Sequence, residues 1–286
     1  MTRTALIVGD CFATCCLIDN VDTVSGFAKK IRAVASGMIA PDELPGEVIW
    51  GQGVGEHERT YISRLASGLD ESVAPKFIGQ IATPATRGHV HKRAPQNVLI
   101  SVPERENDQR FVSDLIIDSR NELLIDHVTG QHVQGMVLVE ACRQMFLAVT
   151  EEHFLGEKAP LETYFVIKSM GVEFKSFVFP VGAQVVFSLG RLTHKEGGRL
   201  AADAAISIWQ NNAECVTCSV SYSVFDASQL AARELELARE AARRSMGNGS
   251  TRVAENAEPD FAPIDLPIAA ISVPRDGAAQ DLRVGA

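Results

Sequence analysis

One apolar segment constrains the fold more than any other part of the sequence. In GMVLVEACRQMFLAV (135–149), apolar residues cover most of the circumference of a helix that we predict from about Gly135 to His153. A helix that is apolar nearly all round is buried on nearly all sides. Other elements of the fold must therefore surround this helix.

Strand patterns lie on both sides of the predicted helix along the chain. We predict two strands before it and four long strands after it, at 97–102, 110–118, 163–178, 183–193, 200–210 and 214–226. In the last strand, apolar residues from Val216 to Val224 alternate with Thr and Ser, which is typical of a strand with one buried face. These patterns predict an antiparallel sheet wrapped around one long helix.

Residues 1–86 show a different order of elements. Predicted strands alternate with predicted helices here, the strands at 5–8, 47–50 and 76–81 and the helices at 23–36 and 56–67. Such alternation favours βαβ units with a parallel sheet. We therefore expect an α+β chain in which a small α/β domain (1–86) precedes a strand-rich domain (87–226).

The C-terminal part changes composition twice. Ala, Glu, Arg and Leu favour a helix over 227–246, with Glu240 and Arg244 spaced to pair. The tail 247–286 is rich in Gly, Ala, Pro and Asp and has one aromatic residue, Phe261. This composition predicts a tail that is disordered or lies on a partner surface.

Deletion of the chain after about Gly247 should leave the melting temperature within a few degrees of that of the full chain, because the tail composition predicts no core. Thermal unfolding of the two proteins, followed by circular dichroism, measures this. A large drop in melting temperature would show instead that the tail packs.

Charge and composition exclude several kinds of partner. The net charge is −9 and the pI about 5.3, with no cluster of Lys and Arg, so we expect no nucleic-acid partner. No apolar run approaches the roughly 18 residues of a membrane span, and Ala5–Val8 is too short for a signal-peptide core. The six cysteines show no pairing pattern. We expect a cytoplasmic protein with reduced thiols and no cofactor, and with no membrane partner.

Two features of the predicted α/β domain have alternative interpretations. The glycines in VGD (8–10) and WGQGVG (50–55) follow strands, where a ligand can approach the backbone, but they lack the order of a nucleotide-binding loop. Cys11 could be a nucleophile at a helix start, although a small buried thiol is favoured because no His or Asp stands beside it in a suitable place.

Glu140 interrupts the apolar helix. A buried carboxylate is costly unless it is paired or used in chemistry. A structural pair with Arg143 or Gln144 is one interpretation. The other is a site residue whose pKa is raised by burial into a range useful for proton transfer.

The segment DHVTGQHVQGMVLVEACRQ (126–144) resembles the signature of the A-factor biosynthesis (AfsA-type) hotdog family, and HVHK (89–92) and FVIKSMGVEFKSF (165–177) also match it. The resemblance covers about Gly88 to Asp226. The segment is similar, more distantly, to β-hydroxyacyl-thioester dehydratases, which share a loop histidine, a glycine that opens the helix and an EAxxQ helix. The resemblance implies a hotdog fold for the second domain.

The sequence departs from this family in two ways. Gln134 stands where both groups usually have Pro, and A-factor enzymes usually carry two hotdog repeats, whereas residues 1–86 do not resemble a repeat. A single repeat implies a homodimer, because the sheet edge and helix face that it leaves open would be covered by a second copy.

The resemblance implies an acyltransferase that takes a β-ketoacyl group from acyl-carrier protein or CoA. In the A-factor family the acceptor is the hydroxyl of dihydroxyacetone phosphate, on the way to a γ-butyrolactone signal. Two kinds of site residue are implied: catalytic His127 and Glu140, and oxyanion- or substrate-binding Gly135, Met136, His132, Arg143 and Gln144. The helix start offers free N–H groups to a thioester oxygen.

Other functions stay open on the sequence alone. The same side chains could serve a dehydratase or a thioesterase, or the chain could be a non-catalytic acyl-binding or regulatory module that works through its first domain. A metal site from His127, His132 and Asp126 is disfavoured, because the sequence shows no further ligand cluster.

Overall fold

The computed structural model describes residues 3–126, 130–155, 162–194 and 199–247. His127, which was predicted to be catalytic, and nearly all of the predicted tail lie outside these residues. The chain divides into two compact units, Met1–Arg233 and Glu234–Ala286. The boundary predicted near residue 86 therefore lies within the first unit.

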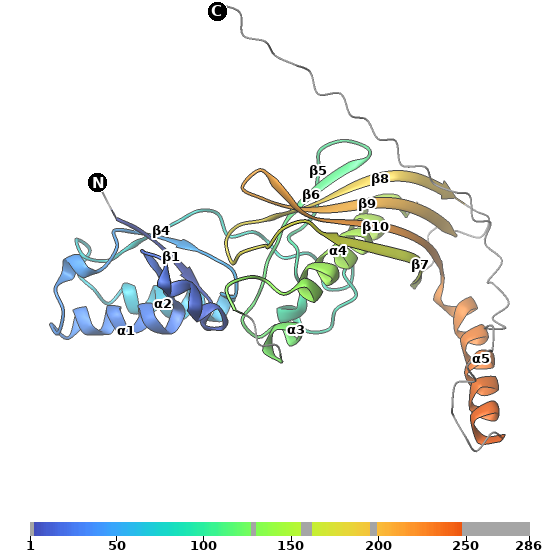
Figure 1. Ribbon diagram of the computed structural model, residues 1–286, viewed down its shortest axis with the longest axis horizontal. Coiled ribbons are helices and arrows are strands. Elements are labelled where there is room, and N and C mark those ends of the chain that lie inside the picture. Colours follow the sequence, from blue (N-terminus) through green and yellow to red (C-terminus); the bar gives the residue numbers. More distant parts are fainter. Residues whose placement is uncertain (1–2, 127–129, 156–161, 195–198, 248–286) are drawn as a thin grey trace, which may run out of the picture. The chain divides into compact units, whose positions relative to one another are not determined.

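A four-stranded parallel sheet forms the N-terminal part (Figure 1). Its strand order is β2-β1-β3-β4. In chain order the elements are β1 (Thr4–Val8), η1 (Asp10–Leu17), β2 (Val21–Thr23), α1 (Val24–Ala35), η2 (Pro41–Glu43), β3 (Glu47–Trp50), α2 (Glu56–Ala66) and β4 (Lys76–Ile78). The predicted alternation of strands and helices, with parallel strands, is confirmed.

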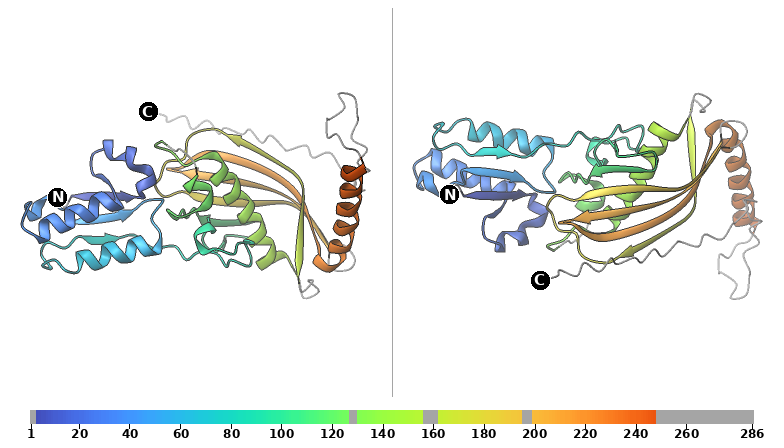
Figure 2. Two further views of the ribbon diagram at one scale, coloured as in Figure 1. Left: turned by 90° about the horizontal axis from the view of Figure 1, so that it is seen from below. Right: turned by 90° about the horizontal axis from the view of Figure 1, so that it is seen from above.

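A six-stranded antiparallel sheet follows, in the order β5-β6-β8-β9-β10-β7. In chain order its region contains η3 (Pro95–Asn97), β5 (Glu104–Arg105), β6 (Arg110–Asp114), α3 (Glu122–Ile125), α4 (Gly135–Val149), η4 (Thr150–Phe154), β7 (Thr163–Phe174), β8 (Gln184–His194), β9 (Leu200–Gln210) and β10 (Ala213–Asp226). Figures 1 and 2 show α4 lying along one face of this sheet. The predicted sheet around a long helix is confirmed.

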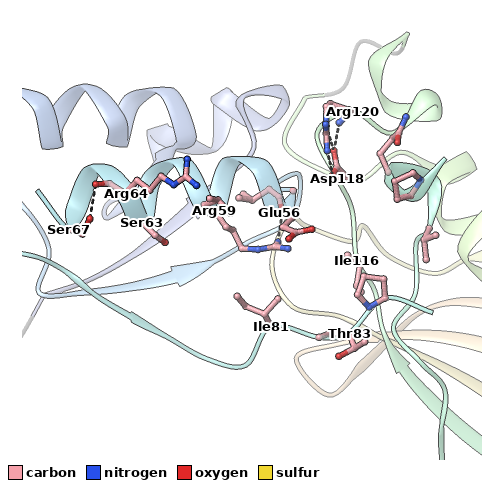
Figure 3. A pocket seen from close by; sticks show the side chains of 18 residues that line it. Glu56, Arg59, Ser63, Arg64, Ser67, Ile81, Thr83, Ile116, Asp118 and Arg120 are labelled. Carbon is pink, nitrogen blue, oxygen red and sulfur yellow. Dashed lines mark hydrogen bonds and ion pairs between the residues drawn. The ribbon is translucent and has the colours of Figure 1, made fainter. Parts of the chain in front are cut away.

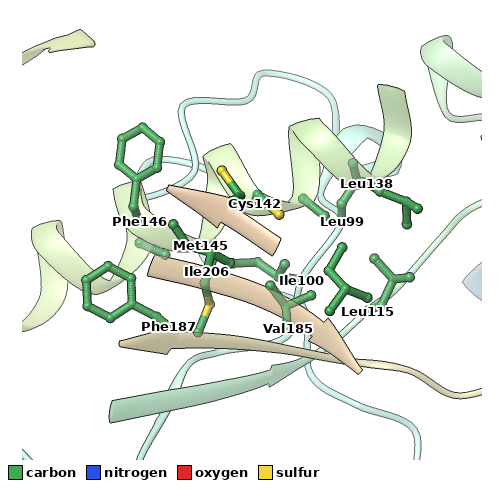
Figure 4. Close-up of a cluster of buried hydrophobic side chains, with 14 of the residues drawn as sticks. Leu99, Ile100, Leu115, Leu138, Cys142, Met145, Phe146, Val185, Phe187 and Ile206 are labelled. Carbon is green, nitrogen blue, oxygen red and sulfur yellow. The ribbon is translucent and has the colours of Figure 1, made fainter. Parts of the chain in front are cut away.

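The larger of two hydrophobic cores lies between α4 and the six-stranded sheet (Figure 4), and a smaller one packs α1 and α2 against the N-terminal sheet. Ten of the fifteen residues of α4 are buried, as its all-round apolar pattern predicts. The helix side chains of Cys142, Met145 and Phe146 pack in one cluster with Val185 and Ile206 of the strands. The less buried residues of α4 include Met136, Glu140 and Arg143, which share one face because they are three or four residues apart.

The prediction of a strand over 97–102 is wrong. This segment makes only isolated bridges, from Ile100 to Leu115 and from Ser101 to Pro84. One reason is that the Leu99 N–H is used by a side chain: it donates to Gln144 Oε1 at 2.8 Å rather than to a neighbouring strand. The strand that precedes β6 in the sheet is the two-residue β5 instead.

Helix α5 (Ala227–Gly247) agrees with the helix predicted over 227–246. The expected pair is present, with an η nitrogen of Arg244 2.5 Å from Glu240 Oε1. Among the described residues, no helix is long and apolar enough to cross a membrane.

Candidate functional site on helix α4

Glu140 lies at the centre of a cluster of charged and polar side chains on α4. Arg143, one turn along, binds both of its oxygens, with Nε 2.7 Å from Oε2 and an η nitrogen 2.9 Å from Oε1. Lys92 Nζ lies 2.7 Å from Oε1, and the Gln144 amide donates to the same oxygen at 3.1 Å. The cluster therefore joins the HVHK segment to the EAxxQ helix.

Both pairs considered from the sequence, Glu140 with Arg143 and Glu140 with Gln144, are present, and the pKa of Glu140 is lowered, which contradicts the alternative expectation that burial raises it. Burial does act to raise this pKa, but hydrogen bonds from Arg143, Lys92 and Gln144 and the charge of Arg143 outweigh it. The carboxylate therefore stays ionised near neutral pH. Its Oε1 accepts three hydrogen bonds, whereas the one donor described at Oε2 is Arg143, which leaves Oε2 with capacity for another.

Gln144 is fully buried and ties α4 to the segment before β6. Its Oε1 accepts from the Leu99 N–H at 2.8 Å, and its Nε2 donates to the Asn97 carbonyl at 2.8 Å. The side-chain amide of Gln144 is therefore hydrogen-bonded to backbone groups of the protein itself. The predicted substrate-binding role of Gln144 thus has a structural alternative, in which it positions Glu140.

The start of α4 is an exposed apolar surface. Met136 is 60% exposed, and a methyl group placed on Gly135 would lie 3.1 Å from the ring of Phe174, which is itself 53% exposed. The ring of His132 lies 4.6 Å from that of Phe177. The structure thus brings Gly135, Met136 and His132 together around the free N–H groups of the helix start.

The sequence interpretation missed His91 and Glu151. His91 Nε2 lies 3.1 Å from Glu151 Oε1, across sixty positions of the chain. Both lie beside α4, since Glu151 belongs to η4, the π-helix that continues it. His91 and Arg143 line a cavity of about 150 Å³, together with Phe146, Leu147, Thr163, Tyr164, Phe165 and Ile167. The HVHK motif was the one sequence signal that pointed to His91.

The segment WGQGVG after β3 contacts the second sheet region, whereas Gly9 lies against Gly53 of that same segment. The Gln52 N–H donates to the Pro180 carbonyl at 2.9 Å and the Gly53 N–H to the Ile117 carbonyl at 2.9 Å. A methyl group on Gly51 would lie 2.5 Å from the Pro180 carbonyl oxygen. Backbone of the second sheet region, rather than a ligand, thus makes the close approach that these glycines permit.

Cys11 matches the interpretation as a structural thiol. Burial raises the pKa of its thiol to about 11, and the charge of Asp10 adds to that rise. A thiol with this pKa is almost entirely protonated at neutral pH and is a weak nucleophile.

A wider cleft of about 850 Å³ lies between α2 and the segments around Thr83 and Asp118 (Figure 3). Three of its charged groups have partners within the protein. Arg59 donates to the Val54 carbonyl at 2.6 Å, and Arg120 donates to Asp118 at 3.1 Å.

Metal ligands do not gather in the part of the chain that the structure describes. Within it, no three His, Cys, Asp or Glu side chains are placed to hold a metal ion. His127, one of the ligands considered from the sequence, is outside that part.

The chain was compared with proteins of known sequence and structure. Similar solved structures include a phenylacetic acid degradation-related protein from Ralstonia eutropha JMP134 (14% identity, 43% of this chain and 83% of that chain, TM-score 0.33). Another is a thioesterase from Haemophilus influenzae (15% identity, 44% and 78%, TM-score 0.31). A third is a hot-dog-like protein from Thermanaerovibrio acidaminovorans (18% identity, 37% and 72%, TM-score 0.29). No curated protein matches the chain.

The family match includes both segments that form the Glu140 cluster, HVHK (89–92) and helix α4. The model of the A-factor biosynthesis hotdog domain matches residues 73–226, more than half of the 286 residues. The match includes Lys92, Glu140 and Arg143, and it begins before the boundary predicted near residue 86. The fold and the resemblance inferred from the sequence are confirmed, and the chain belongs to the A-factor biosynthesis hotdog domain family.

Proposed function

We propose that this protein is an acyltransferase that moves a β-ketoacyl group from the thioester of acyl-carrier protein to the hydroxyl of a small acceptor. The product would be a precursor of a γ-butyrolactone-type signal or another secondary metabolite. The observation that carries the proposal is the Glu140 cluster, because it lies on the central helix of a domain of the A-factor biosynthesis family.

The acyl thioester is proposed to lie at the start of α4. Exposed Met136 and Phe174 offer apolar surface to an acyl chain. The free N–H groups at Gly135 and Met136, at the positive end of the helix dipole, suit the oxygen that gains charge when a thioester carbonyl is attacked. His132 lies at the same helix start and is proposed to contact the thioester there.

The acceptor is proposed to bind near Glu140. Its hydroxyl can donate to Oε2, while Arg143 and Lys92 keep the carboxylate ionised. His127 or Glu140 takes the hydroxyl proton, the acceptor oxygen bonds to the carbonyl carbon, and the carbon–sulfur bond breaks. The thiol leaves with a proton, so the step is balanced without a cofactor.

Product analysis by mass spectrometry tests this proposal. The protein is incubated with β-ketoacyl-carrier protein and with hydroxylated acceptors, dihydroxyacetone phosphate among them, and the expected product is an acyl ester that appears only with acceptor. Free β-keto acid would indicate a thioesterase, and conversion of a β-hydroxyacyl thioester to an enoyl thioester would indicate a dehydratase. A bound thioester that is never turned over would indicate a binding module.

The protein is also proposed to be a homodimer. β7 is twelve residues long and forms one edge of the six-stranded sheet, with Ile167 41% exposed. An exposed strand edge is a template for pairing with another chain. Light scattering at micromolar concentration should give the mass of two chains.

Ile167→Lys, which places a charge on this edge, should shift the protein toward the mass of one chain. Ser169→Lys changes a second exposed residue of β7 and should have the same effect. Val102→Lys changes an exposed residue away from this edge and should leave the dimer intact. A wild-type monomer, or dissociation by Val102→Lys alone, would contradict the proposed interface.

A further inference from the structure

We propose that the wide cleft beside α2 binds a small phosphate ester whose organic portion is apolar. The volume of this cleft, about 850 Å³, lies within the range of about 300–1,000 Å³ that ligand pockets span (Figure 3). None of the described residues that line it belongs to α4. The site is therefore separate from the Glu140 cluster, and the inference goes beyond the proposed acyl transfer.

One side of α2 forms the polar wall of the cleft. The residues that line the cleft from this helix recur mostly every three or four positions, so they share one side of it: Glu56, Arg59, Thr60, Ser63, Arg64 and Ser67. At 3.6 residues per turn, the three hydroxyl residues lie between the two arginines around the helix axis. An anion held by both arginines would therefore lie over hydroxyl groups.

Arg59 and Arg64 have hydrogen-bond donors to spare. A guanidinium carries five N–H donors. One η nitrogen of Arg59 donates to the Val54 carbonyl at 2.6 Å, and the Arg64 side chain makes no hydrogen bond or ion pair within the described part of the chain. Burial lowers the pKa of Arg59, and an anion beside it would offset this loss of solvation.

The acidic groups of the cleft leave room for an anion on the arginine wall. Asp118 is already paired with Arg120, whose Nε and one η nitrogen lie 3.1 and 3.2 Å from its two oxygens. Glu56 lies in the first turn of α2, about two turns before Arg64. A phosphate ester has three free oxygens, which can accept from both arginines and from a hydroxyl at once, whereas a carboxylate has two.

A smaller hollow of about 260 Å³ adjoins the cleft and suits the apolar portion of the ligand. The cleft and the hollow share six lining residues: Val54, Arg59, Ile81, Ala82, Pro84 and Ile116. The hollow also reaches Trp50 at the end of β3, where Trp50 stacks on Phe77, and Gly79 just after β4. Ligands of α/β sheets bind outside the carboxyl ends of the strands, which is where this hollow lies.

Asp114 determines which end of the ligand lies in the smaller hollow. It lines that hollow, and the other charged group among the described lining residues there is Arg59. A carboxylate repels a phosphate group, so the phosphate lies on the α2 wall, with Arg59 and Arg64. The apolar portion then extends toward Trp50.

Phenyl phosphate is the probe for this site, because it joins a phosphate to an apolar ring. The chain has two tryptophans, Trp50 and Trp209, so the variant Trp209→Phe leaves Trp50 as the reporter. Titration of this variant in phosphate-free buffer should change the emission of Trp50 in a saturable way. Absence of a saturable change, together with absence of binding to the wild-type chain by calorimetry, would overturn the proposal.

Arginine variants test the phosphate contacts. Arg59→Gln and Arg64→Gln should each weaken the binding of phenyl phosphate about tenfold or more, because each removes hydrogen bonds from a charged donor. Arg239→Gln removes the same charge from the exposed helix α5 and should bind phenyl phosphate like the wild type. Wild-type affinity in both Arg59→Gln and Arg64→Gln would overturn the assignment of the cleft.

Two further probes test the two parts of the ligand. Phenol and inorganic phosphate should each bind at least tenfold more weakly than phenyl phosphate, at about 1.4 kcal/mol per tenfold. Phenol that binds as tightly would overturn the phosphate contacts, and inorganic phosphate that binds as tightly would overturn the apolar hollow. Loss of phenyl phosphate binding in Arg143→Gln, with binding kept in Arg64→Gln, would place the anion at the Glu140 cluster and likewise overturn the proposal. None of these results depends on acyl transfer.

Discussion

Glu140→Gln is expected to lower turnover by about 10²–10⁴-fold, the range for a group that handles the reacting hydroxyl. Glutamine keeps the size of the side chain but removes the charge that holds Arg143 and Lys92. Steady-state kinetics on the purified variant measure the change. Glu152→Gln, the same substitution farther along the helical segment, should leave turnover unchanged, and full activity in Glu140→Gln would refute its place in the site.

The same variant should also lose stability, by about 1–3 kcal/mol, because Arg143 and Lys92 lose the negative charge of their partner and the glutamine NH2 group cannot accept the hydrogen bond from Arg143 Nε. The side chains of Arg143 and Lys92 are 27% and 25% exposed. Water can therefore solvate part of their charge, and we expect no larger loss of stability. Arg143→Ala should cost a similar amount, since it removes the bidentate partner of a carboxylate that is only 14% exposed. Denaturant unfolding of both variants measures these differences.

The stability difference should depend on pH in a defined direction. The pKa of Glu140 is lowered in the folded protein from an ordinary value of 4.5, so its stabilisation is fully present above that value. It is lost as the pH falls through the lowered pKa. The gap in melting temperature between wild type and Glu140→Gln should therefore be widest near neutral pH and shrink below about pH 4.5. A gap that is constant with pH would show that the charge is not its cause.

Gly9→Ala is expected to destabilise the first unit by about 3 kcal/mol or more, the upper range for an overpacked site. Gly9 has a φ of −62°, which any residue adopts, so the cost comes only from contact. The added methyl group would lie 2.1 Å from the Gly53 carbonyl oxygen, and backbone atoms cannot move aside as a flexible side chain can.

Gly182→Ala is the control for this prediction, because a methyl group there meets no atom within 4 Å. Denaturant unfolding should give Gly182→Ala nearly the stability of wild type and Gly9→Ala a much lower midpoint. Equal stability of the two variants would contradict the close contact between the ends of β1 and β3.

Sequence patterns were informative where the physical cause is local. The period of apolar residues along 135–149 determined a buried helix, and the alternation along 214–226 determined a strand with one buried face, because both depend only on which way successive side chains point. The parallel N-terminal sheet followed from the order of strands and helices. The family signature in 126–144 then identified the hotdog fold.

Tertiary structure decided what depends on residues that are distant in the chain. Lys92 reaches Glu140 and His91 reaches Glu151 only because the HVHK turn folds against α4. The sequence therefore indicated Arg143 and Gln144 as partners of Glu140, one turn along the same helix, but not Lys92, which also lowers its pKa. The segment 97–102 failed as a strand for the same reason, since the Gln144 side chain takes the Leu99 N–H. Periodicity records the environment of a side chain, whereas a site depends on pairs of atoms that only the folded chain brings within hydrogen-bonding distance.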